Sequence, residues 1–293
     1  MKNIQLIAPA SQVPNLKKSD LKVLGNLLKK LNYNLNYTNY LFEKKYFLAG
    51  EDKTRLSDFE NAFYDKNIHC ILALRGGEGC MRLLDKIDYQ KIKENPKVLF
   101  GFSDITALQN ALWKKAKLQS FTGFLGKDGL HEVSPTLLKN LKSALNNQIS
   151  KIPFKTIKSG NANGILLGGN MTVFTALLGT PYMPEMKNNI LLLEEVNESA
   201  YRLDRMFNQL RLAGIFDKIS GLILGDMTAN LKPKDKKMAQ AIIKDHLSYI
   251  KCPIVQIEKY SHHNGQIILP IGVKAQIDTN QGYLFLDKIK NFI

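Results

Sequence analysis

Cysteine is scarce in this sequence of 293 residues, and the three cysteines present form no C-x-x-C pair. An odd number of widely spaced cysteines, Cys70, Cys80 and Cys252, argues against a disulfide framework and against a Cys-rich zinc site. The histidines add no H-E-x-x-H spacing. We therefore expect buried, reduced thiols, no metal site and no cofactor.

Long hydrophobic runs are also missing. No stretch approaches the roughly 20 apolar residues of a membrane span, and the apolar run within residues 1–15 is too short for the core of a secretory signal peptide. We expect a cytoplasmic protein that does not associate with membranes. Its hydrophobic content of 44% supports one large domain or two ordinary ones.

Acidic residues are few: 26 stand against 41 lysines and arginines, which gives a formal net charge of +15. Clustered cations bind nucleic acids by releasing counterions from the phosphates. Here the charge is spread along the chain, and the cluster KPKDKK at 232–237 has no interleaved aromatic residues. We expect no nucleic-acid binding, and we interpret the excess lysine as a solvated surface that can attract anionic substrates.

Short apolar strands alternate with amphipathic helices along the first half of the chain. The predicted strands are the opening segment 3–11, which runs into a polar turn, then 69–74 and 97–102. The predicted helices are 19–31, 80–87, 104–116 and one that begins at a capping box of Ser57 with Glu60. This alternation predicts an α/β domain over residues 1–145, with a doubly wound, mostly parallel sheet covered on both faces.

The composition changes after that domain. Residues 146–163 are polar and contain proline, glycine, serine and asparagine, which predicts a linker. Residues 164–293 contain several predicted strands, two helices and a final hairpin at 273–287. We predict a second, β-rich α/β domain over this range.

Ser103 lies in the stretch GFSDITAL, where a predicted strand is followed by a helix. A tight turn there can expose its hydroxyl while the following amides, starting with Asp104, point toward the same space, as in a nucleophile elbow. Ile105 stands where the G-x-S-x-G motif has glycine, which disfavours the ordinary α/β-hydrolases. Alternatively, Ser103 or Asp104 caps the helix. The glycines of the RGGEG loop, 75–79, either bring backbone N–H groups to a ligand or form an ordinary turn.

A serine nucleophile needs a histidine as base. Of the five histidines, His69 and His246 fall within predicted strand and helix patterns, which indicates structural roles, and His131 lies in a polar loop. His262 and His263 follow a predicted strand, where an imidazole can face a cleft. A solvated loop is an equal alternative for this pair.

The triad also needs an acid, and Glu194 and Glu195 close a buried apolar strand. Burying a carboxylate without a partner is expensive, and a histidine is a suitable partner. Because side chains alternate across a strand, one of the two glutamates can face the site, and periodicity does not say which.

Taken together and in order, five segments of the chain resemble the LD-carboxypeptidase family of serine peptidases. They are ALRGGEGCMRLLDKIDY, GFSDITAL, GILLGGNMTVFTALLGTPYMP, ILLLEEVNESAYRLDRMFNQL and YSHHNGQIILPIG. The resemblance extends over nearly the whole chain. It implies an α/β N-terminal domain with the nucleophile, a β-rich C-terminal domain with glutamate and histidine, and a homodimer.

The resemblance also implies roles for individual residues. It makes Ser103 the nucleophile, Glu194 the acid and His262 the base, although Ser261 stands where the family usually has glycine. The oxyanion donors would be the N–H of Asp104 and that of Gly76 or Gly77, and the substrate contacts would include Arg75 and Asn170. The implied reaction is hydrolysis of the L,D-type bond between meso-diaminopimelate and the terminal D-alanine of murein tetrapeptides.

Two other functions compete with this hypothesis. One is a self-immunity peptidase of the same family, which cleaves aminoacyl or peptidyl adenylate antibiotics with the same triad and a different pocket. The other is a non-catalytic α/β protein that uses the RGGEG loop to bind an anion. A reagent specific for active-site serines distinguishes the non-catalytic alternative from both peptidases. It labels Ser103 if the chain is a peptidase and leaves Ser103 unlabelled if the chain only binds an anion.

Overall fold

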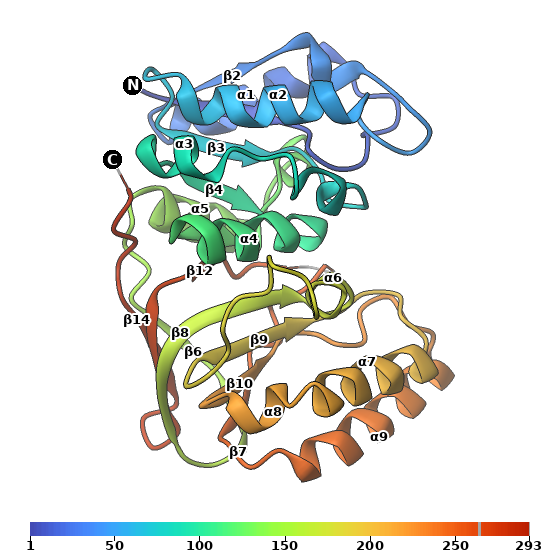
Figure 1. Cartoon of the computed structure of the whole chain (residues 1–293). Coiled ribbons are helices and arrows are strands. Elements are labelled where there is room, and N and C mark those ends of the chain that lie inside the picture. Colours follow the sequence, from blue (N-terminus) through green and yellow to red (C-terminus); the bar gives the residue numbers. More distant parts are fainter. Residues whose placement is uncertain (263–264, 293) are drawn as a thin grey trace.

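The computed structural model describes residues 1–262 and 265–292, and within them the chain forms two β-sheets, each with its own helices (Figure 1). The sheet formed mainly by the first half of the chain lies above the other in Figure 1. In this described part of the chain, no helix is both long and apolar enough to cross a bilayer.

The first sheet has six strands in the order β12-β5-β4-β3-β1-β2. Their bounds are β1 Lys2–Ile7, β2 Tyr33–Tyr37, β3 Cys70–Ala73, β4 Val98–Gly101, β5 Ser120–Thr122 and β12 Leu269–Ile271. All neighbours are parallel except β12, which runs antiparallel to β5. Every residue of β3 and β4 is buried, as expected for parallel strands covered on both faces.

Helices cover the first sheet because each presents an apolar stripe to it. Three leucines of α1, Leu21, Leu24 and Leu28, are buried at spacings of three and four residues. The helices of this half are α1 Lys18–Lys30, α2 Asp52–Tyr64, α3 Tyr89–Glu94, α4 Thr106–Ala116 and α5 Pro135–Leu145, with 3-10 turns η1 Asn39–Phe42, η2 Cys80–Leu83, η3 Ser103–Ile105 and η4 Gly126–Gly129.

The second sheet has eight strands in the order β6-β14-β13-β8-β9-β10-β11-β7. Their bounds are β6 Lys151–Pro153, β7 Lys155–Lys158, β8 Asn161–Asn170, β9 Ile190–Glu194, β10 Gly221–Leu224, β11 Ile254–Gln256, β13 Lys274–Asp278 and β14 Tyr283–Leu286. Strands β8 to β11 are parallel, and the other pairs are antiparallel. Its helices are α6 Met171–Ala176, α7 Ala200–Leu212, α8 Ile215–Lys218 and α9 Pro233–Tyr249. The predicted fold class is confirmed.

Local details differ from the sequence prediction. Residues 146–163, predicted as a linker, contribute β6 and β7 to the second sheet. All four residues of β7 are exposed, and three of them are polar. The sequence of this edge strand therefore resembles that of a loop. The predicted capping box at Ser57 is wrong, because α2 begins five residues earlier, at Asp52, and Ser57 lies inside it. The predicted helix 80–87 is reduced to the single turn η2.

Asp58 of α2 provides a test of stability. Its carboxylate is 6% exposed and accepts a hydrogen bond from the Thr38 hydroxyl at 2.9 Å, and burial raises its pKa to about 6. The folded state therefore favours the neutral acid, and the contribution of Asp58 to the free energy of unfolding falls as the pH rises from the unfolded pKa toward 6. We expect Asp58→Asn to raise the free energy of unfolding at pH 7.5 by roughly 2 kcal/mol, and to raise it much less at pH 4. Urea denaturation at both pH values measures this, and an equal effect at both would contradict it.

Candidate active site

Ser103 begins η3 two residues after the end of β4, and its backbone is held in the left-handed region with φ +63°. This conformation costs on the order of 1 kcal/mol for a residue with a side chain. Neither Ser103 nor Asp104 caps α4 with its side chain, because the cap position Ile105 has no side-chain bond and the Asp104 carboxylate accepts a hydrogen bond from the Cys80 N–H at 2.8 Å. The capping alternative is therefore wrong, and the strained turn presents the Ser103 side chain to a cavity of about 460 Å³.

The RGGEG loop passes directly over this serine. A Cβ on Gly76 would lie 2.7 Å from the Ser103 Cβ and 3.0 Å from its Oγ, so no larger residue fits there without a shift. The next residue, Gly77, has φ +99° and lines the same cavity as Ser103 and Asp104. Loop and serine meet because β3 and β4 are parallel neighbours whose carboxyl ends share one edge of the sheet.

Glu194, which is buried, pairs with the half-buried His262. Glu194 is the last residue of β9, and its side chain is fully buried. Its Oε2 lies 2.8 Å from His262 Nδ1. The His262 ring packs on Phe102, the residue before Ser103, with ring centroids 4.4 Å apart. Its Nε2 is buried and has no hydrogen-bond partner within residues 1–262 and 265–292, so no bond to Ser103 is formed there. His263 lies outside the described residues.

Glu195 faces a different set of partners. Its Oε2 accepts hydrogen bonds from the N–H and hydroxyl of Thr172 at 2.8 and 2.7 Å, and its Oε1 accepts from the Val196 N–H at 2.9 Å. Burial raises the pKa of Glu195, while these donors act in the opposite direction. The sequence left open which of the two glutamates pairs with the histidine. In the structure Glu194 contacts His262 and Glu195 does not.

Asn170 joins the two carboxylates. Its Nδ2 donates to Glu194 Oε1 at 3.2 Å and to Glu195 Oε1 at 3.0 Å, and its Oδ1 accepts from the Val173 N–H at the start of α6. Asn170 also lines the cavity of Ser103, and its contact with substrate stays a prediction. Sequence reasoning did not identify Thr172, whose two bonds to Glu195 have no recognisable sequence signal.

Buried contacts join the part of the chain that carries Ser103 to the part that carries Glu194 and His262. The Asn170 N–H donates to the Thr106 hydroxyl of α4 at 3.0 Å, and the hydroxyls of Thr122 and Tyr260 lie 2.8 Å apart. A Cβ on Gly169, whose φ is +136°, would lie 2.5 Å from the Thr106 Oγ1, so glycine lets β8 approach α4 closely. Strand β12 extends this junction by pairing with β5. The serine and the Glu194–His262 pair therefore belong to one packed unit.

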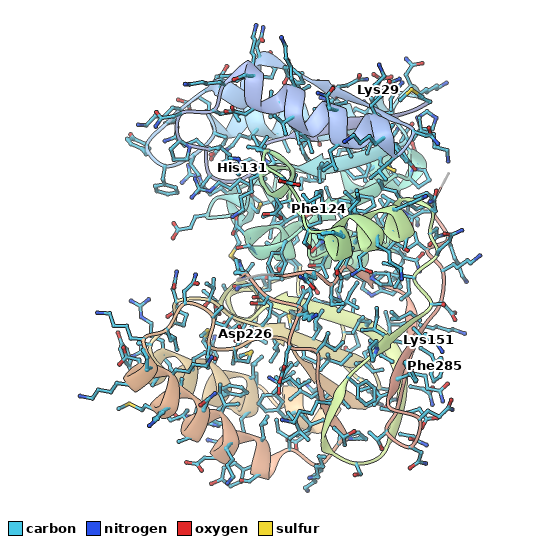
Figure 2. All side chains as sticks on the ribbon, turned by 180° about the vertical axis from the view of Figure 1, so that it is seen from behind. Lys29, Phe124, His131, Lys151, Asp226 and Phe285 are labelled. Carbon is cyan, nitrogen blue, oxygen red and sulfur yellow. The ribbon has the colours of Figure 1, made fainter. Side chains whose placement is uncertain are left out.

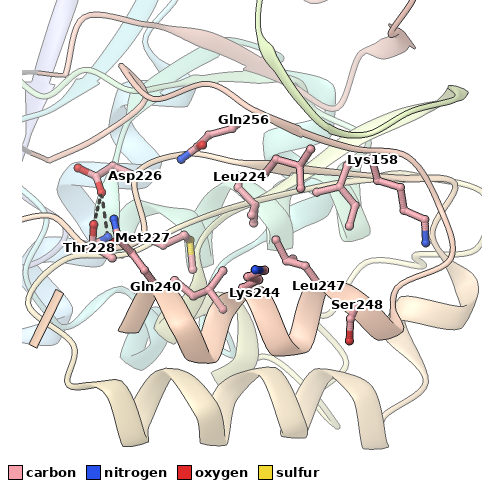
Figure 3. A pocket seen from close by; sticks show the side chains of 13 residues that line it. Lys158, Leu224, Asp226, Met227, Thr228, Gln240, Lys244, Leu247, Ser248 and Gln256 are labelled. Atoms are coloured by element: carbon pink, nitrogen blue, oxygen red, sulfur yellow. Dashed lines mark hydrogen bonds between the residues drawn. The ribbon is translucent and has the colours of Figure 1, made fainter. Parts of the chain in front are cut away.

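A hydrogen bond from Ser261 to Asp226 fixes the chain just before His262. The Ser261 hydroxyl donates to Asp226 Oδ2 at 3.2 Å, and Asp226 Oδ1 accepts from the N–H of Thr228 at 2.8 Å (Figure 3). Serine in place of the glycine usual at position 261 is thus compatible with an imidazole that reaches Glu194. Figure 3 also shows a cavity of about 560 Å³ between α9 and strands β10 and β11, which is lined by none of Ser103, Glu194 and His262.

The other histidines are placed as follows. His246 stacks on Phe207 and its Nε2 lies 2.8 Å from Asp204, and His69 Nδ1 accepts a hydrogen bond from the Asn3 N–H. Both are structural, as predicted. His131, labelled in Figure 2, is exposed in the loop before α5.

Arg75 also lies near His262. Its guanidinium donates to the Gln12 carbonyl, and both Arg75 and His262 line a second cavity, of about 620 Å³. Among the described residues, no group of three or more His, Cys, Asp or Glu side chains could hold a metal ion. The three cysteines are free thiols, with Cys70 and Cys80 buried and Cys252 half-buried.

Both halves of the chain match a known family. Residues 4–123 match the N-terminal domain of LD-carboxypeptidases, and residues 163–277 match the C-terminal domain. The chain belongs to the LD-carboxypeptidase family. Ser103 falls in the N-terminal match, and Glu194 and His262 fall in the C-terminal one.

Known members of the LD-carboxypeptidase family cover most of the chain. A probable murein peptide carboxypeptidase of Bacillus subtilis is 30% identical over 287 residues, which are 94% of this chain and 88% of that protein. The microcin C7 self-immunity protein MccF of Escherichia coli is 29% identical over 80% of this chain and 78% of its own length. The crystal structure of a muramoyltetrapeptide carboxypeptidase from Oxalobacter formigenes superposes with a TM-score of 0.87 at 28% identity and covers 99% of both chains.

Proposed function

We propose that this LD-carboxypeptidase is a serine peptidase that hydrolyses the L,D-type bond between meso-diaminopimelate and the terminal D-alanine of murein tetrapeptides. The observation that carries the proposal is the hydrogen-bonded Glu194–His262 pair. The His262 ring packs on Phe102, the residue before Ser103, and Ser103 is held in the left-handed region and does not cap α4. The relatives named for murein peptides and muramoyltetrapeptides support the substrate.

Acylation uses the free nitrogen of His262. Because Nδ1 is bound to Glu194, the neutral ring carries its proton there and Nε2 is an acceptor. Nε2 takes the proton from the Ser103 hydroxyl as Oγ attacks the peptide carbonyl. The Ser103–His262 hydrogen bond forms when substrate is bound, since catalytic bonds are often long in substrate-free enzymes.

The tetrahedral intermediate carries a negative oxygen, which needs donors. Asp104 and Gly77 line the same cavity as Ser103, and their backbone N–H groups serve as the oxyanion site. The protonated His262 then gives its proton to the nitrogen of D-alanine, and D-alanine leaves. Water attacks the remaining ester on Ser103, gives a proton to His262, and the serine recovers that proton as the product acid leaves.

Defined murein tri-, tetra- and pentapeptides test this function directly. The purified protein is expected to convert the tetrapeptide to the tripeptide and free D-alanine, and to leave the tripeptide intact, as followed by mass spectrometry. A tetrapeptide that remains uncleaved at high enzyme concentration would exclude the proposed substrate.

The similarity to MccF favours one second candidate, cleavage of aminoacyl or peptidyl adenylates. The same serine, glutamate and histidine would serve, and the pocket would differ. Incubation of the protein with an aminoacyl sulfamoyl adenosine and, separately, with the tetrapeptide compares the two substrates under one condition. Faster turnover of the adenylate analogue would reverse our assignment.

A further inference from the structure

Two separate cavities adjoin the catalytic groups, and they share no lining residue among those described. The cavity of about 460 Å³ contains Ser103, and the cavity of about 620 Å³ contains His262. The leaving nitrogen must receive its proton from the general acid. If His262 is that acid, the residue that leaves lies on the His262 side and the acyl residue lies on the Ser103 side.

The Ser103 side is unfavourable for a carboxylate. Its lining includes the side chains of Glu78, Glu195 and Glu198. The one cation among its described lining residues is Arg82, whose Nε and Nη2 are bound to Asp52 at 2.9 Å each. The lone carboxylate of a leaving residue would meet these acidic groups here, whereas the free carboxylate of diaminopimelate is accompanied by an ammonium that can pair with them.

The His262 side offers two cations that lie next to each other. The Lys127 N–H donates to the Leu74 carbonyl at 2.8 Å, which holds Lys127 beside Arg75. The Lys127 side chain has no ion pair within the described part of the chain, and the Arg75 guanidinium uses one nitrogen on the Gln12 carbonyl. Both residues line the cavity together with His262.

Two acidic residues line the same cavity. Asp128 accepts a hydrogen bond from the Leu125 N–H at 2.9 Å, and burial raises its pKa. Glu132 is exposed to solvent, where screening weakens its effect. Arg75 and Lys127 therefore remain the groups suited to an anion beside the leaving nitrogen.

We propose that Arg75 and Lys127 bind the free C-terminal carboxylate of the leaving residue and so restrict this enzyme to the last bond of a peptide. The inference rests on the proposed function, and it adds which end of the substrate is recognised and by which side chains. A guanidinium and an ammonium together suit a carboxylate, since charged hydrogen bonds are stronger than neutral ones.

The test compares the murein tetrapeptide with the same peptide ending in D-alaninamide, which lacks the negative charge. We expect the wild-type protein to cleave the acid about 100-fold more efficiently than the amide, measured as kcat/KM. Lys127→Met should lower kcat/KM for the acid about 10-fold, mainly through KM, and leave the value for the amide nearly unchanged. Lys127→Arg should retain most of the preference.

Two further variants complete the design. Lys236→Met removes an equivalent exposed charge from α9, on a distant part of the molecule, and is expected to change neither substrate's kcat/KM (Figure 1). Arg75→Lys replaces the guanidinium with an ammonium and keeps the positive charge, so it should retain most of the preference for the acid. Equal cleavage of acid and amide by the wild-type protein would overturn the inference while the proposed reaction stands. Failure to cleave either substrate would overturn the proposed function and the inference with it.

Discussion

Ser103→Ala is expected to fold like the parent protein and to release D-alanine from a murein tetrapeptide at least 10³-fold more slowly. Removing one member of a serine triad abolishes the nucleophile or its activation, and losses of roughly 10³ to 10⁶ in kcat are typical. The Ser103 hydroxyl makes no hydrogen bond within the described residues, and alanine keeps the Cβ, so the free energy of unfolding should change by less than about 1 kcal/mol.

The measurement pairs a release assay with urea denaturation. Ser248→Ala is the matched control, because its hydroxyl bonds to the Asp245 carbonyl at an exposed site on α9. That variant should retain the parent's activity. Release of D-alanine by Ser103→Ala at the parent's rate would move the chemistry to another residue.

The second large effect separates the two neighbouring glutamates. Glu194→Gln keeps the size of the side chain but removes the negative charge that holds the His262 Nδ1 proton, so the ring loses its required tautomer and its cation loses its partner. We expect kcat to fall roughly 10³-fold to 10⁴-fold with little change in KM.

Glu195→Gln should behave in the opposite way. This carboxylate accepts hydrogen bonds from Thr172, Val196 and Asn170 and does not contact His262. An amide in its place turns N–H groups toward N–H donors, which should lower the free energy of unfolding by about 1–3 kcal/mol. The activity of the folded fraction should stay within about 10-fold of the parent. Activity assays and urea denaturation on both variants give the answer, and a larger loss of kcat in Glu195→Gln than in Glu194→Gln would exchange their roles.

Much of the fold follows from patterns within short stretches of sequence. The apolar runs at 70–73 and 98–101 became buried parallel strands, and the leucine spacing of 19–31 became α1. Such patterns are local, because a strand buried on both faces needs continuous apolar residues and a helix needs an apolar stripe. The edge strands β6 and β7 were not predicted. β6 has only three residues, of which Ile152 alone is buried, and the fully exposed β7 has the composition of a loop.

The sequence alone determined which residue types stand at the strand ends: a serine after β4, glycines after β3, and two carboxylates at and beyond the end of β9. Only the tertiary structure decided which glutamate meets the imidazole, that Asn170 bridges the carboxylates, and that a segment beyond residue 260 completes the first sheet. Alternation along a strand does not identify a partner. Glu194 contacts Asn170 and His262, which lie 24 and 68 positions away in the sequence, and no local pattern records such contacts.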